Sequence, residues 1–214
     1  MGLTKISDLL EAASLAVNNT QGNPAIQQQL EAYGLRAAQL QTGQRRLQVL
    51  KQKHDAQLQL QNERWALSQQ INASLLATRD LFKSHARAAT VAFQHDPALI
   101  QALNIVPLAT RRWECVRQAS MFYQQLQERE LSLAAFGISV QEIQEVQANV
   151  AQLLQLKEKR VHKKERCEQG TQDRKQAQDD LHDWVIEFRS TARVAFRSQP
   201  QVLEIFGMRV ATAV

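Results

Sequence analysis

Apolar residues in the second half of the chain recur at spacings of three and four, the period of a helix with one buried face. The clearest run forms a heptad-like seam and consists of Ile143, Val146, Val150 and Leu153. Residues that break helices are rare nearby: no Gly or Pro lies between Gln44 and Asp96, and only Gly170 interrupts 139–199. The pattern predicts an all-α protein with two long helical stretches.

An internal repeat relates the two halves of the chain at a constant offset of 103 positions. The sequence at 89–93 recurs, with one change, at 192–196. Further matches at the same offset pair Gly34 with Gly137, Pro97 with Pro200 and Asn104 with Gly207. We therefore expect a tandem duplication of a unit of roughly 100 residues, with helical repeat 1 over 1–106 and helical repeat 2 over 107–214.

Each repeat is predicted to contain two short helices, a long helical segment and a final short helix that begins at a proline. The expected starts are marked by helix-capping residues, namely Ser7, Thr110, Asn23 before Pro24, and Ser139 with Glu142 as a capping box. Gly34, Gly137, Asn104 and Gly207 are candidates for left-handed residues that end helices.

The long segments, 36–95 and 139–199, fit either one long helix or a hairpin of two helices. The order of charges favours the hairpin, because a basic run at 157–166 is followed by aspartates after Gly170. A turn at Gly170 places Arg166 opposite Asp173, and Lys159 and Arg160 opposite Asp179 and Asp180. The predicted fold is thus a helical bundle made of two helical-hairpin units with short capping helices.

Composition agrees with helices, since the 214 residues include 7 Gly and 4 Pro, and 44% are hydrophobic. The start of the sequence lacks a signal-peptide pattern, and no window is apolar enough for a membrane span. Cys115 and Cys167 form no CxxC pair, which is typical of thiols in a reducing compartment. We expect a cytoplasmic protein. The net charge of +5 does not by itself indicate nucleic-acid binding.

The strongest candidate for a metal site brings four side chains to one helix face: Asp179, His182, Asp183 and Glu187. Repeat 1 keeps only Asp80 of this group and has Arg79 in place of His182, so helix-stabilising acids are the preferred interpretation. A second grouping, His162, Glu165 and Cys167, lies among cations. His85 aligns with Phe188 and is expected in the core. The sequence predicts no metal, no cofactor, no catalytic residue and no enzymatic activity.

Two features are candidates for interaction surfaces. The first is a set of cations that could follow a phosphate backbone: Lys157, Lys159, Arg160, Lys163, Lys164 and Arg166. It lacks aromatic residues for base stacking, and a solvated helical arm fits it better. The second is Trp65, which aligns with Glu168 and lies near the expected tip of the first hairpin, where an exposed aromatic residue would mark a contact surface.

The C-terminal end, from Trp184 and Phe188 through 192–196 to 200–208, resembles a motif of uncharacterised bacterial all-helical proteins. The resemblance covers about 25 residues and implies a bacterial helical bundle and no activity. We expect a non-enzymatic scaffold that binds a protein partner or its own copy through long helical arms. Two alternatives stay open, namely a helical bundle that binds a small or lipid-like molecule, and weak nucleic-acid binding through 157–166.

Overall fold

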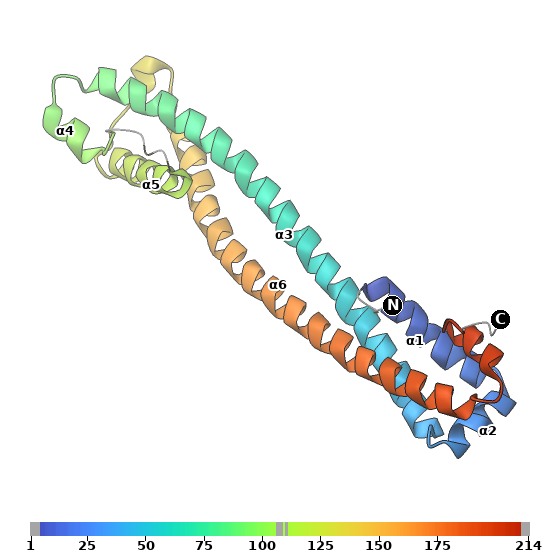
Figure 1. Cartoon of the computed structure of the whole chain (residues 1–214). Helices are drawn as coiled ribbons and strands as arrows, with labels where there is room; N and C mark the ends of the chain where they lie inside the picture. Colours follow the sequence, from blue (N-terminus) through green and yellow to red (C-terminus); the bar gives the residue numbers. More distant parts are fainter. Residues whose placement is uncertain (1–4, 106–108, 110, 211–214) are drawn as a thin grey trace. The chain divides into compact units, whose positions relative to one another are not determined.

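The computed structural model describes residues 5–105, 109 and 111–210, and these are helical with short connections (Figure 1). The helices are α1 (Ile6–Gln21), α2 (Pro24–Ala32), α3 (Ala37–Ala92), α4 (Pro97–Ala102), α5 (Arg112–Glu128) and α6 (Val140–Ala195), with 3₁₀ helices η1 (Ala134–Phe136) and η2 (Pro200–Phe206). No strand occurs in this part of the chain, so the all-α prediction is confirmed. No helix within it combines the length and apolarity that crossing a membrane requires.

Helices α3 and α6 are continuous over 56 residues each, so the predicted hairpin within each long segment is wrong. Gly170 lies inside α6 and does not end it. A glycine within a helix costs about 1 kcal/mol relative to alanine, which the neighbouring helix-forming residues outweigh. An added Cβ at Gly170 would lie 3.1 Å from Cδ1 of Leu60, so this glycine marks a close approach of α3 and α6.

The charges that favoured a turn at Gly170 instead join α3 to α6. The Lys53 ammonium group lies 2.7 Å from a carboxylate oxygen of Asp173, where the hairpin required Arg166. Lys163 forms an ion pair with Glu63. The sequence therefore contained a correct signal of antiparallel pairing, but the pairing connects the two repeats and does not lie within one repeat.

Two compact units result, and each contains parts of both predicted repeats. Unit 1 comprises Met1–Gln61 and Arg166–Val214, and unit 2 comprises Asn62–Glu165. In unit 1, η2 packs beside α1 (Figure 1), and the Asn19 amide donates a hydrogen bond of 2.6 Å to the Ile205 carbonyl.

Unit 1 has an aromatic core between the beginning of α3 and the end of α6. Trp184, Phe188 and Phe206 are buried. The Phe188 ring contacts both others, with ring centroids 5.5 Å from Trp184 and 5.1 Å from Phe206. The Trp184 indole N–H donates to the Gln39 carbonyl at 3.0 Å. Gly43 allows this approach, because a Cβ there would overlap the indole ring. Large aromatic side chains thus bring α6 directly against the α3 backbone.

Unit 2 has its own core, formed by the end of α3, α5 and the beginning of α6. Phe82, Phe122 and Tyr123 are fully buried and in mutual contact. The heptad-like seam over Ile143–Leu153 is buried in the same cluster. The seam is therefore covered within unit 2 and does not need a second chain.

The helix ends follow the sequence signals closely. Both ends of α6 lie 103 residues after the matching ends of α3. The four residues expected in the left-handed conformation, Gly34, Asn104, Gly137 and Gly207, all have positive φ. Asn23 and Ser139 accept backbone hydrogen bonds at helix starts as predicted. Ser7 does not cap a helix, since it lies inside α1, and Thr110 lies outside the described residues.

Division of the chain after Val106 tests whether each unit is built from segments of both predicted repeats, an arrangement called here the exchange of segments. Each unit needs segments from both fragments, so 1–106 and 107–214 should not form stable folded monomers when each is produced alone. Mixed from denaturant, they should assemble into a one-to-one complex with the helix content of the intact chain. Circular dichroism and light scattering measure both properties. A stable helical monomer of either fragment would contradict the exchange.

Gly43→Ala and Gly170→Ala form a matched pair that tests the helix contacts. The new methyl group at position 43 meets the buried Trp184 ring and should lower the free energy of unfolding by about 1–3 kcal/mol. At position 170 it meets only the flexible end of Leu60, and the gain in helix propensity should give a change between zero and about 1 kcal/mol of stabilisation. Urea unfolding measures both. A Gly170→Ala variant that loses more stability than Gly43→Ala would argue for a turn at this position.

Candidate functional site

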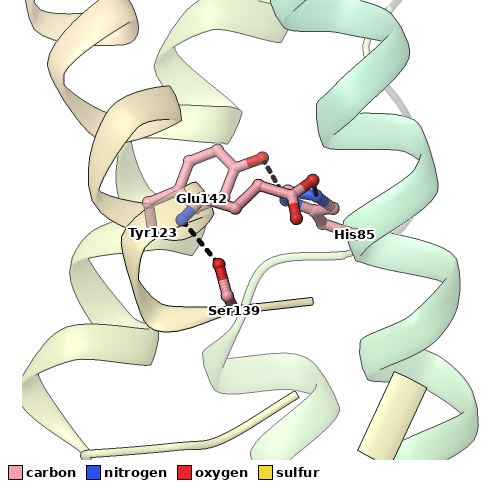
Figure 2. Close-up of polar contacts among 4 residues, drawn as sticks. All are labelled: His85, Tyr123, Ser139 and Glu142. Atoms are coloured by element: carbon pink, nitrogen blue, oxygen red, sulfur yellow. Dashed lines mark hydrogen bonds and ion pairs between the residues drawn. The ribbon is translucent and has the colours of Figure 1, made fainter. Parts of the chain in front are cut away.

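A cluster of hydrogen-bonding side chains lies inside unit 2, where three helices meet (Figure 2). His85 on α3 has its Nδ1 atom 3.0 Å from the Tyr123 hydroxyl of α5, and its Nε2 atom 3.1 Å from a carboxylate oxygen of Glu142 on α6. His85 and Tyr123 are 1% and 0% exposed. The carboxylate only accepts, so the Nε2 atom donates to Glu142, and the Tyr123 hydroxyl is the partner of the Nδ1 atom.

Glu142 reaches His85 because of the way in which α6 begins. The Ser139 hydroxyl accepts a hydrogen bond of 3.1 Å from the Glu142 backbone N–H, the first half of the predicted capping box. The Glu142 carboxylate makes the contact with His85 (Figure 2). At the equivalent start of α3, Gln39 accepts from the Arg36 backbone N–H at 2.7 Å. A local capping residue has thus become a contact between helices.

The cluster resembles an acid–base group in composition, and two of its three members, His85 and Tyr123, are buried. Burial, and secondarily the negative charge of Glu142, raise the pKa of Tyr123 well above the ordinary tyrosine range. The imidazole has both nitrogens occupied and only 1% of its surface exposed. A substrate would need to reach one of these atoms for proton transfer. The cluster therefore holds α3, α5 and α6 together.

A cavity of about 330 Å³ opens in unit 2 on the side where α3 and α5 adjoin. Its lining is mainly apolar, with two arginines and two further polar side chains: Asn72, Leu75, Leu76, Thr78, Arg79, Ala109, Arg112, Cys115, Val116 and Ala119. Leu76 lines this cavity and is 63% exposed, so it adds apolar surface at the cavity edge. A volume of this size is at the lower end of the range for ligand-binding pockets.

The charges at the cavity are positive. The Arg112 guanidinium donates to the Asn72 side-chain oxygen at 3.0 Å, which fixes it across α5 and α3. Arg79 lies near the Cys115 thiol, whose pKa is raised by burial, an effect that the positive charge of Arg79 opposes. A buried thiol with a raised pKa is a poor nucleophile, and the described lining combines an apolar surface with two arginines.

The six cations predicted as an interaction site all lie on α6 but differ in their contacts and exposure. Lys157 lies over the Trp113 ring with its Nζ atom 5.6 Å from the centroid, and Lys163 pairs with Glu63. Two cations of the basic run are therefore engaged within unit 2, while Lys159 and Arg160 are exposed on α6. Lys164 and Arg166 are exposed too, and Lys164 has an interaction of its own.

Trp65 is 67% exposed. It lies within the continuous α3 and not at the tip of a hairpin. Trp184, in contrast, is a buried core residue of unit 1.

Neither predicted grouping of acids and histidines forms a metal site in the described part of the chain, where no three His, Cys, Asp or Glu side chains come together as ligands would. His182 Nδ1 lies 4.0 Å from a carboxylate oxygen of Asp183, and both side chains are exposed. His162 and Glu165 form a similar exposed contact of 3.5 Å. The Cys167 thiol is directed instead to the Leu60 carbonyl.

The cavity was not predicted from the sequence, although the predicted internal repeat contains a signal of it. At the offset of 103, Leu75, Leu76 and Arg79 align with Gln178, Asp179 and His182. Two apolar residues in repeat 1 thus correspond to two polar residues in repeat 2. An exposed leucine at a position that is polar in the other copy was the available indication of a surface specific to unit 2.

Comparisons of this chain with models of protein families, with curated proteins and with solved structures find no match in any of the three.

Substitution of Tyr123 by Phe tests the cluster through the pH dependence of stability. Tyr123 stays protonated in the fold at pH values where it ionises in the unfolded chain, so the free energy of unfolding should fall as the pH rises above about 10. The ionisation of one group changes the free energy of unfolding by at most about 1.4 kcal/mol per pH unit. Tyr123→Phe should remove that contribution, whereas Tyr33→Phe, which leaves Tyr123 in place, should retain it.

Urea unfolding of the three proteins at about pH 8.5 and 10.5 measures the difference. At the lower pH, Tyr123→Phe should also cost about 1–3 kcal/mol, because the buried His85 nitrogen loses its partner. Identical pH dependence in all three proteins would show that Tyr123 ionises as freely in the fold as in the unfolded chain.

Proposed function

We propose that this protein is a non-enzymatic helical interaction protein that binds a protein partner through unit 2. The observation that carries the proposal is the exposed apolar surface of α3, where Trp65 is 67% exposed and Leu76 is 63% exposed at the edge of a cavity with an apolar lining. Large exposed apolar side chains that border a cavity are characteristic of binding surfaces. In the histidine cluster the His85 and Tyr123 side chains are buried, and the Glu142 carboxylate is engaged with His85.

The same proposal includes a tandem duplication, with repeats over 1–106 and 107–214. The equal lengths of α3 and α6 and the shared positive-φ positions support it. The free thiols Cys115 and Cys167 fit a protein that works in the reducing cytoplasm. Binding to its own copy is less favoured than a different partner, because the heptad-like seam is buried within unit 2.

A small amphiphilic molecule is the second candidate ligand, and the cavity favours it. A volume of about 330 Å³ with an apolar lining suits a small molecule. Such a ligand would leave Trp65 uncovered, since Trp65 does not line the cavity. The exposed tryptophan therefore favours a larger partner. Nucleic-acid binding through 157–166 is not supported by the engagement of Lys157 and Lys163 within unit 2.

A photo-reactive amino acid at position 76 tests the proposal in the cells that produce the protein. The probe lies at the exposed edge of the cavity, and a matched probe at Ile186, 50% exposed on α6 in unit 1, serves as the control. We expect a covalent adduct with one other protein from position 76, lost when Trp65 is changed to Ala, and none from position 186.

Adducts that contain only a second copy of this chain would favour self-association. No adduct specific to position 76, or equal adducts from both positions, would contradict the proposed interaction surface.

A further inference from the structure

Two of the exposed apolar residues of unit 2, Trp65 and Leu76, lie on one face of α3. Trp65 and Leu76 are separated by 11 residues, which is three helical turns or about 16 Å. Asn72 lies between them, one turn before Leu76, and it lines the cavity and accepts the hydrogen bond from Arg112. The surface is therefore an elongated strip, with the cavity at one end and a tryptophan at the other.

Cations border the apolar part of this strip. Arg79 and Arg112 both line the cavity, one from α3 and one from α5. Arg112 is held by Asn72, so its guanidinium is positioned before any ligand arrives. Guanidinium groups at the edge of an apolar site bind carboxylates well, because the planar fork matches two carboxylate oxygens.

The corresponding face of repeat 2 does not have these features. Leu76 aligns with Asp179 and Arg79 with His182, so the combination of leucine and arginine is confined to repeat 1. Trp65 likewise aligns with Glu168. A difference at three positions along the same helical strip indicates a surface specialised for one ligand and not a general property of the fold.

We propose that the partner presents an acidic amphipathic helix, which lies along α3 with apolar side chains against Leu76 and Trp65 and in the cavity, and with carboxylates on Arg79 and Arg112. A helix of four to five turns is longer than the distance of about 16 Å between Trp65 and Leu76, so it can contact both residues. A small molecule would cover only the cavity. The proposal rests on the proposed function, and it specifies the chemistry of the partner at the same surface.

Two synthetic helical peptides of about 18 residues test it against the full chain. Both carry leucine along one face, and the flanks carry glutamate in one peptide and lysine in the other. Fluorescence anisotropy should show that the glutamate peptide binds and the lysine peptide does not. The double variant Arg79→Glu, Arg112→Glu should weaken the glutamate peptide at least about tenfold and allow the lysine peptide to bind. Leu76→Glu should weaken the glutamate peptide as well.

Controls keep the result specific. Arg197→Glu and Ile186→Glu make the same changes on exposed residues of unit 1 and should leave binding of the glutamate peptide unchanged. All substituted positions are exposed, and circular dichroism verifies that each variant retains the helix content of the parent. A variant that has lost it is replaced by Arg79→Gln, which should still weaken binding.

Several results would overturn the inference. One is equal binding of both peptides, and another is glutamate-peptide binding that is unchanged by the arginine reversals. A third is the absence of peptide binding while a medium-chain fatty acid binds and is lost with the arginine variants, which would assign the cavity to small amphiphiles. If the peptides fail while the adduct at position 76 persists, the protein partner stands and only its acidic helical chemistry is wrong.

Discussion

A continuous helix of 56 residues cannot fold back on itself, so its apolar face has to be covered by other segments of the chain. In this protein the cover for α3 is α6, and the reverse also holds. Within unit 1 the contacts run from Gln39 with Trp184 to Lys53 with Asp173, so the two helices are antiparallel. The short helices then cover the flanks, where they bury apolar surface that none of them could bury alone. Both units depend on this pairing.

The two units use the same helix pattern with different chemistry at equivalent positions. Unit 1 places Phe188 in an aromatic core, where unit 2 has His85 between Tyr123 and Glu142. Apolar rings contribute stability by burial, whereas the histidine cluster must satisfy each polar atom and so fixes the positions of three helices. Unit 2 combines this fixed framework with the open, apolar and cationic surface that we propose for partner binding. A rigid scaffold beneath an exposed strip favours binding, because little order is lost on association.

The sequence predicted the helices and their ends well, because caps and left-handed residues act locally. Gly34, Asn104 and Gly207 were identified from their residue type and from their matches at the offset of 103, and all three have positive φ. The hairpin was wrong because charge order is compatible with any antiparallel partner: Asp173 pairs with Lys53, which is 120 positions away in the chain. The cavity could not be derived either, since Arg79 and Arg112 come together only through the tertiary contact of α3 with α5. Trp65 was identified for two reasons: its counterpart, Glu168, is polar, and it was expected near a hairpin tip, which the continuous α3 shows to be wrong.

The most direct test of the account is backbone NMR across 162–176, which contains Gly170. The account requires an unbroken helix there, since α6 reaches from unit 2 into unit 1 through this stretch. It predicts helical Cα chemical shifts at every residue, including both neighbours of Gly170, and slow amide exchange at Cys167 and Thr171, which contact α3. Non-helical shifts over several residues around Gly170, with fast amide exchange, would show a hairpin tip. That result would contradict the pairing of α3 with α6 on which both units and the proposed binding surface are built.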